Sequence, residues 1–160
     1  MIELTINSRR AEVMLSRMGS RAADLRPLWP AVQEALASMA ARQFRAGGPP
    51  SHPWAPLSEM TLAMRREGPF PGNARILVDT GGLQESWMGG AQSVIRPSRD
   101  SLAYGSRYTG PGGEAIASKH QYGGVSRRGA WVPKRAIEVT EPVARHIGAL
   151  VERFVANGRA

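Results

Sequence analysis

A chain of 160 residues, 42% of them hydrophobic, is long enough to form one compact domain with a packed core and too apolar to be disordered throughout. The sequence contains no cysteine, which excludes disulfide bonds, thiolate metal sites and a cysteine nucleophile. Its net charge of +8 at pH 7 favours an acidic partner, either a polyanion or an acidic protein surface.

The first part of the chain predicts a strand and two helices. Apolar and polar residues alternate over residues 1–7, as in a short strand with one buried face, and this stretch lacks the apolar core of a signal peptide. Residues 10–21 predict a short helix, and Asp24 is a suitable N-cap for a longer one that ends at the Gly-Gly-Pro-Pro sequence of residues 47–50. The apolar residues of this longer helix recur at helical spacing: Val32, Leu36, Met39, Ala40 and Phe44.

A section rich in proline and glycine follows. Residues 47–56 contain four prolines and two glycines, which predicts irregular structure. Ser58 is a candidate N-cap for a short helix that ends near Glu67. Residues 68–73 predict a second irregular stretch for the same reason as the first.

The triplet Asp79-Thr80-Gly81 follows a short apolar segment, residues 76–78. Such a triplet after an apolar strand is the active-site sequence of aspartic proteases, in which two carboxylates share a proton, so a single copy would require a homodimer. Residues 83–87 instead predict a helical turn, which favours Asp79 or Thr80 as its cap and Gly81 as a backbone hinge. The protease is the less favoured alternative, and acid-optimum peptidase activity abolished by Asp79→Asn would support it.

The remaining elements complete an α+β pattern. Residues 94–96 and 102–104 flank a turn sequence and predict a β-hairpin. Residues 105–135 predict a long, Gly-rich loop that we expect to be mobile, and residues 141–157 predict an amphipathic helix. We therefore expect one domain over residues 1–160, in which a small, mostly antiparallel sheet packs against an N-terminal and a C-terminal helix, with long Gly/Pro-rich loops.

Positive charge is concentrated in the last third of the chain. Residues 101–160 carry nine Lys or Arg against four acidic residues. A nucleic-acid-binding module is one alternative that this excess supports, although the sequence has no helix-turn-helix signature, zinc-finger spacing or RNA-recognition motif. A solvated basic surface is the other.

Three sequence motifs, taken together and in order, carry a resemblance to a known family. They are Trp54-Ala-Pro-Leu-Ser58, then Ile76-Leu-Val-Asp-Thr-Gly81 with Leu83 and Ser86, and finally His120-Gln-Tyr-Gly-Gly124. Over roughly residues 25–155 the chain resembles the phage virion morphogenesis family, the tail-completion proteins of Mu-like and related tailed phages.

The resemblance implies a structural protein that acts by assembling and not by catalysis. It implies a neck or tail-completion component at the head–tail junction or tail end, built as a ring that we expect to be hexameric. The implied partners are tail-tube or neck (connector) proteins, with non-specific contact to DNA passing through the lumen, and no membrane. The implied location is the virion, after assembly in the host cytoplasm, and no cofactor is expected.

Candidate contact residues lie in the first motif and in the basic loop, because Trp and Arg are the side chains most enriched at interface centres. They are Trp54, Pro56, Leu57, Tyr108, His120, Gln121, Tyr122, Arg127, Arg128, Trp131, Lys134 and Arg135. Turn or cap roles are expected for Asp79, Thr80, Gly81, Gly123 and Gly124.

Two of these candidates carry an alternative role. Trp54 could be a hydrophobic plug over the sheet, and His120 with Gln121 could be a loop pair that bonds to backbone groups. The three histidines lie near no second ligand at metal-binding spacing, so no metal site is predicted.

Overall fold

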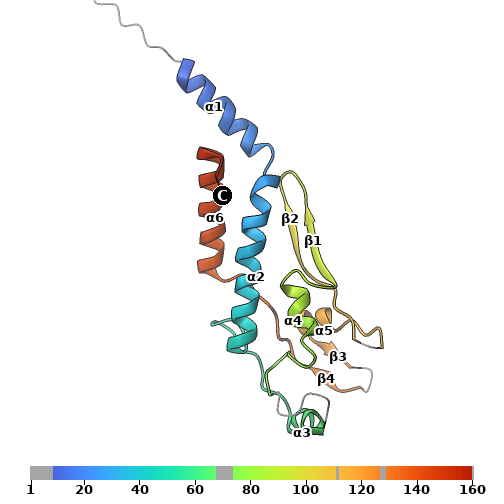
Figure 1. The fold of residues 1–160 in the computed structure, drawn as a ribbon. Helices are drawn as coiled ribbons and strands as arrows, with labels where there is room; N and C mark the ends of the chain where they lie inside the picture. The colour runs from blue at the N-terminus through green and yellow to red at the C-terminus, as the bar shows by residue number, and fades with distance from the viewer. Residues whose placement is uncertain (1–8, 68–73, 111, 127–128, 160) are drawn as a thin grey trace, which may run out of the picture.

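The computed structural model describes residues 9–67, 74–110, 112–126 and 129–159 (Figure 1). The expected strand at Ile2, Leu4 and Ile6 and the irregular stretch of residues 68–73 lie outside the described residues, as do Arg127 and Arg128. The molecule is elongated, with helix α1 at one end and the small elements α3, α5, β3 and β4 at the other. Within the described chain, no helix is both long enough and apolar enough to cross a membrane.

The long helix α2 (Trp29–Ala46) runs along the centre of the molecule. It follows a 3-10 turn (Arg26–Leu28), and the prolines at positions 27 and 30 lie in these first turns, where a missing N–H costs nothing. Asp24 accepts a hydrogen bond from the Arg26 N–H at 3.1 Å, just before the turn. Gly47 adopts a left-handed conformation (φ +77°) and ends the helix where the sequence predicted.

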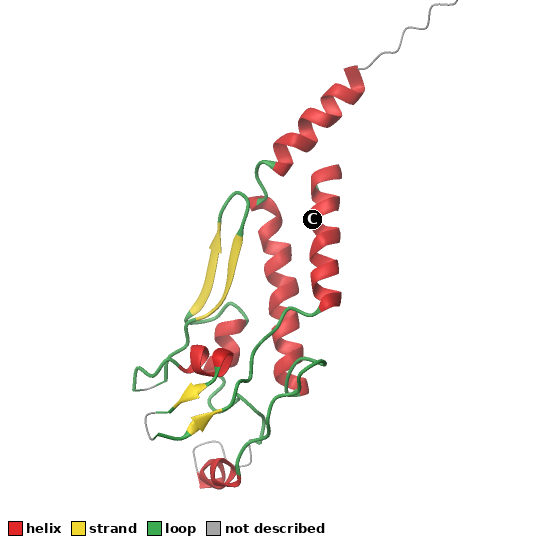
Figure 2. Ribbon diagram, turned by 180° about the vertical axis from the view of Figure 1, so that it is seen from behind, coloured by secondary structure: helices red, strands yellow, loops and turns green. Residues whose placement is uncertain are grey.

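The core forms where α2 meets the C-terminal helix α6 (Glu141–Asn157), which lies beside it in both views (Figures 1 and 2). The two helices run antiparallel, and each buries one apolar stripe. The buried apolar residues are Trp29, Val32, Leu36, Met39, Ala40 and Phe44 on α2, and Val143, Leu150 and Phe154 on α6. The N-terminal helix α1 (Arg9–Ala22) buries none of its residues.

The loop after α2 returns to the core through Trp54, whose side chain is only 5% exposed. Its ring packs edge-on against Phe44, with ring centroids 5.5 Å apart, and its Nε1–H donates to the Ala136 carbonyl at 2.8 Å. Trp54 is therefore a core plug, and the prediction of an interface contact for it is wrong. Helix α3 (Glu59–Glu67) follows, and Ser58 caps it by accepting from the Thr61 N–H at 3.2 Å.

The α+β class is confirmed, with the strands divided between two separate antiparallel hairpins. Strand β1 (Ser93–Pro97) pairs with β2 (Leu102–Ser106), with Ile95 opposite Tyr104. The short helix α4 (Gly82–Trp87) packs on this hairpin, where the rings of Trp87 and Tyr104 lie 6.2 Å apart. Strand β3 (Gly124–Val125) pairs with β4 (Trp131–Val132).

Residues 105–135, predicted as one long loop, contain more regular structure than expected. Helix α5 (Ile116–Tyr122) and the β3–β4 hairpin lie within them. Ala117 is buried and its N–H donates to the Tyr108 carbonyl at 3.1 Å, which fixes the helix to the end of the β2 segment. Helix α5 has only seven residues, and a helix this short is not stable in isolation. Tertiary contacts of this kind stabilise it.

The burial of Trp54 and the exposure of Trp131 predict opposite mutational effects. Trp54→Ala should lower the free energy of unfolding by about 3–5 kcal/mol, because a core ring is lost and the Ala136 carbonyl loses its donor. Trp131→Ala should change it by no more than about 0.5 kcal/mol, since that side chain is 71% exposed. Urea unfolding followed by circular dichroism measures both, and similar losses for the two variants would contradict this packing.

Candidate assembly surface

An exposed apolar surface lies on the α5–β3–β4 unit, at the end of the molecule opposite α1 (Figure 1). Tyr122 is 79% exposed, Trp131 is 71% exposed and Val125 is 54% exposed, and the side chain of Lys134 is also exposed. We call these four residues the α5–β3 surface. Val125 and Trp131 are directly opposite each other in the β3–β4 pair, and Gly123, in the left-handed region at φ +79°, connects α5 to β3 beside the Trp131 ring.

This surface is braced by an extended segment, residues 135–138, that runs behind it. The Gln121 side chain forms both of its hydrogen bonds with Ile137: its Oε1 accepts from the Ile137 N–H at 3.1 Å, and its Nε2 donates to the Ile137 carbonyl at 3.2 Å. The Arg135 N–H donates to the His120 carbonyl at 2.7 Å. Gln121 thus takes the role of a backbone partner, which was the alternative to an interface contact.

Arg135 is 7% exposed and is therefore not an interface residue, contrary to the prediction. Its Nε donates to the Ala55 carbonyl at 2.9 Å and its Nη2 to the Pro56 carbonyl at 3.0 Å. Burial lowers the pKa of Arg135, and the nearby charge of Arg65 lowers it further. A guanidinium remains protonated even so, and here it links the Trp54 loop to the β4 end of the chain.

The other predicted contact residues are divided between the interior and the surface. Pro56 and Lys134 are exposed, whereas Leu57 is half-buried. Tyr108 is half-buried and its ring lies against Gly82 so closely that a Cβ at that glycine would come within 2.6 Å of it. Of the described candidates, Tyr122, Trp131 and Lys134 are therefore exposed on the α5–β3–β4 unit, whereas Trp54 and Arg135 are buried and Tyr108 is half-buried.

The Asp79-Thr80-Gly81 triplet leads into helix α4, as the turn interpretation predicted. The N-cap residue is Gly81, with φ at +89°, and not Asp79 or Thr80 as predicted. Thr80 Oγ1 accepts a long hydrogen bond of 3.5 Å from the Gly82 N–H. Asp79 Oδ1 lies 3.8 Å from Arg65 Nε. A guanidinium is thus one charged neighbour of Asp79, and the second carboxylate of an aspartic-protease dyad would have to come from another copy of the chain.

A cavity of about 360 Å³ lies beside this triplet. Its polar lining includes Arg65, Asp79, Thr80, Tyr108 and His120, and its apolar lining includes Leu77, Leu83 and Ile116. In the part of the chain that the structure describes, no three His, Asp or Glu side chains converge as metal ligands would.

His120 lies in helix α5 and not in a loop, and its side chain is largely buried. Its Nδ1 is buried and has no hydrogen-bond partner among the described residues. Burial lowers the pKa of His120 to about 4; the charge of Arg135 lowers it as well, and Glu114 opposes both. His120 is therefore neutral at pH 7.

Sequence reasoning missed two features of the surface. Val125 was not singled out, although its position opposite Trp131 follows once the β3–β4 hairpin is known. The exposure of Val13, Met14 and Leu15 on α1 was not predicted either. The sequence signal for this exposure is the arginines that share the same helix face, at positions 9, 10, 17 and 21.

The low pKa of His120 predicts a specific pH dependence of stability. In the unfolded chain this histidine titrates near 6.5, so the unfolded state binds more protons than the folded state between about pH 6.5 and pH 4. The contribution of His120 to the free energy of unfolding is therefore fully present above pH 6.5. As the pH falls, the free energy of unfolding decreases by up to about 3 kcal/mol. His120→Leu should reduce the loss of stability between pH 7 and pH 5 in urea unfolding, whereas a variant of the exposed His146, His146→Gln, should retain it. An unchanged pH dependence in His120→Leu would contradict the assignment.

The chain was compared with curated proteins, solved structures and family models. No curated protein and no solved structure matches the chain. The family model described as the phage virion morphogenesis family matches residues 6–153, which includes helices α1 to α6 and both hairpins almost entirely. The match confirms the family resemblance that the three sequence motifs indicated. The chain belongs to the phage virion morphogenesis family.

Proposed function

We propose that this protein is a structural component of the phage neck or tail end, and that it joins its partner through the α5–β3 surface. Family membership supports a structural or assembly role in the virion. The observation that carries the finer proposal is the exposure of Tyr122 and Trp131, at 79% and 71%, on a unit braced by Gln121 and Arg135.

The chemistry of this surface fits a protein partner. Large aromatic side chains contribute most of the binding energy in many protein interfaces when a partner buries them. Their support here is rigid, because residues 135–138 are hydrogen-bonded to α5, to the Trp54 loop and to α2. A preorganised surface loses little conformational entropy on binding, so more of the contact energy contributes to affinity.

A ring is the assembly that we expect, in which one heterologous contact between neighbouring copies repeats until the rotation closes. The hexameric count, the tail-tube or connector partners and the position at the head–tail junction or tail end rest on the family resemblance. The protein would then act without catalysis, in the virion, after assembly in the host cytoplasm. The basic residues of the chain would face either the partner or DNA in the lumen.

Variants of the α5–β3 surface test this function. Trp131→Ser combined with Tyr122→Ser should preserve the fold and reduce the yield of complete, tailed particles at least about tenfold, because the apolar contact with the partner is lost. The measurement is complementation of a phage that lacks this protein, scored by infectious titre and by electron microscopy. Met60→Ser, an equally exposed apolar position on α3, serves as the matched control.

A charge reversal provides a second variant for the same experiment. Arg127→Glu with Arg128→Glu should also impair assembly if the basic sequence between β3 and β4 contacts an acidic partner. Light scattering over a range of protein and salt concentrations would show whether the wild-type chain forms a discrete ring-sized species on its own. Normal particle yield from both double variants would contradict the proposed surface.

A further inference from the structure

Helix α1 lies outside the core and contacts the body mainly through its last turn. Arg21 Nη1 donates to the carbonyls of Val155 and Ala156, both at 2.7 Å, and so caps the C-terminus of α6. None of the residues in α1 is buried, and in Figure 1 the helix points away from α2 and α6. Helix α1 is therefore attached to the end of α6 through Arg21, while none of its residues is buried.

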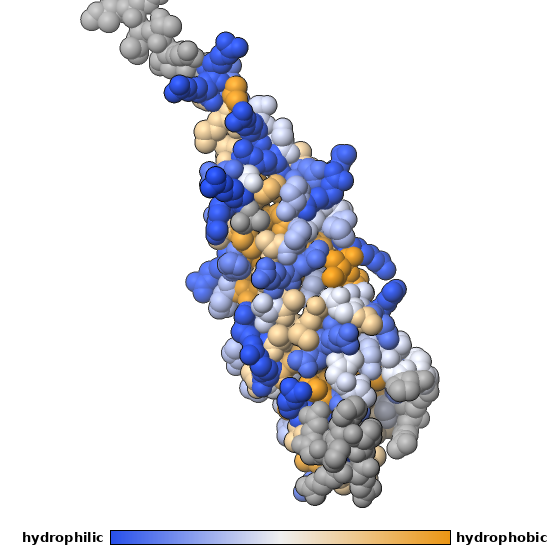
Figure 3. Space-filling model, in the orientation of Figure 1, coloured by the Kyte–Doolittle hydropathy of each residue, from blue (hydrophilic) through white to orange (hydrophobic). Residues whose placement is uncertain are grey.

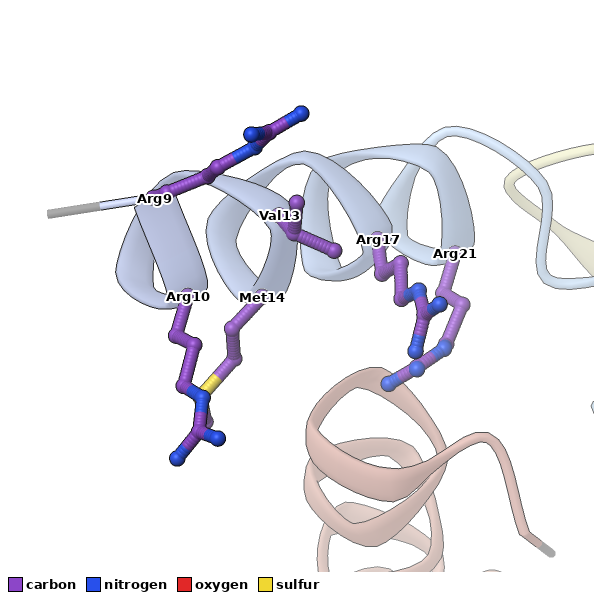
Figure 4. Close-up of a pocket in the computed structure, with 6 residues that line it drawn as sticks. All are labelled: Arg9, Arg10, Val13, Met14, Arg17 and Arg21. Carbon is purple, nitrogen blue, oxygen red and sulfur yellow. The ribbon is translucent and has the colours of Figure 1, made fainter.

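A hollow of about 500 Å³ lies along α1 and is lined by side chains of that helix (Figure 4). Two apolar residues lie in sequence between two pairs of arginines: Arg9, Arg10, Val13, Met14, Arg17 and Arg21. We call these six residues the α1 groove. Figure 4 shows Arg10 and Met14 side by side and Arg17 next to Arg21 at the end of α6, and Figure 3 shows hydrophilic and hydrophobic side chains intermixed at this end of the molecule.

The α1 groove presents both exposed apolar side chains and arginine charges to a partner. Met14 is 57% exposed and Val13 is 46% exposed. Arg10 and Arg17 form no ion pair with a residue that the structure describes. A helix of 14 residues that buries none of its side chains gains little stability from packing, so a partner that packs on it would stabilise it.

We propose that the α1 groove binds an acidic amphipathic helix of another protein. An apolar row on that helix would cover Val13 and Met14, while carboxylates on both sides of the row would pair with Arg10 and Arg17. This contact is separate from the α5–β3 surface, because the two lie at opposite ends of the molecule (Figure 1). It would give the protein a second partner.

Two other occupants fit the groove less well. A second copy of this chain carries a net charge of +8, and five of its acidic side chains already lie near a basic side chain of their own: Asp24, Asp79, Glu114, Glu138 and Glu141. It would therefore bring mainly like charge to the arginines. A nucleic-acid backbone would pair with the arginines and leave Val13 and Met14 without apolar contact.

The test is direct binding to the full-length chain, measured by fluorescence anisotropy. The probe is a fluorescein-labelled synthetic helix with leucines at i, i+4 spacing and glutamates on both flanks. Three reference probes accompany it: the same peptide with serine in place of leucine, a DNA duplex, and vesicles that contain anionic lipid. We expect the leucine peptide to bind at least about tenfold more tightly than the serine peptide, because its apolar row covers Met14.

Variants of the groove identify the site. Met14→Ser should weaken binding of the leucine peptide about tenfold, and Arg10→Glu should weaken it at least about fivefold and reduce its salt dependence. Met60→Ser and Arg45→Glu, exposed positions on α3 and α2, are the matched controls and should bind like wild type. Circular dichroism should show an unchanged fold, since α1 contributes no buried residue to the core.

Several outcomes would overturn the proposal. Equal binding of the leucine and serine peptides would show that the groove recognises charge alone. Wild-type affinity of the Met14→Ser variant for the leucine peptide would show the same. Tighter binding of the duplex or the vesicles would assign the surface to nucleic acid or to lipid. Self-association that Met14→Ser abolishes would assign it to a second copy. The variants of the α5–β3 surface leave helix α1 unchanged. A negative result for peptide binding to the α1 groove would therefore not contradict the proposed function.

Discussion

The structure depends on residues 135–138, an extended segment whose backbone is hydrogen-bonded mainly by side chains. Trp54 Nε1–H donates to the Ala136 carbonyl, and the Gln121 amide pairs with both polar groups of Ile137. Gln43, buried in α2, repeats this pairing at Glu138: its Nε2 donates to the carbonyl at 2.6 Å and its Oε1 accepts from the N–H at 3.1 Å. Each of these contacts satisfies a polar group that would otherwise be buried without a partner, at a cost of about 1–3 kcal/mol each.

These side-chain pairings explain how a chain with so little sheet forms a single core. A segment this deep in a domain normally gains its hydrogen bonds from neighbouring strands. Here the partners come from α2, from the loop after it and from α5, so one segment joins the helical half of the molecule to the Gly/Pro-rich half. Arg135 adds a fourth link, to the carbonyls of Ala55 and Pro56. The α5–β3 surface is rigid because it is the outer side of this junction.

The sequence predicted the elements whose signals are local and missed those whose signals are long-range. Helices α2 and α6 have apolar residues at helical spacing and end at glycines in left-handed conformation, and the β1–β2 hairpin surrounds a turn sequence, so all three were found. Helix α5 was missed because it is short, lies among glycines and is stabilised by contacts with Tyr108 and Ile137. Trp54 and Arg135 were assigned to an interface because nothing near them in sequence reveals that each donates to a distant carbonyl. Tyr122 and Trp131 are exposed, so both are accessible to a partner, and their role at an interface stays a prediction.

The positions of the two exposed surfaces limit how copies of this protein could meet in a ring. The α1 groove is rich in arginine, and the α5–β3 surface includes Lys134 and adjoins two further arginines in the sequence. Direct contact between these two ends would bring positive charge against positive charge, which disfavours an end-to-end interface between copies. In a ring, neighbouring copies would therefore meet along their sides, where the faces of α2 and α6 outside the core carry both acidic and basic residues, such as Glu34, Arg42 and Glu141. The two ends would then remain available for the two different partners that we propose.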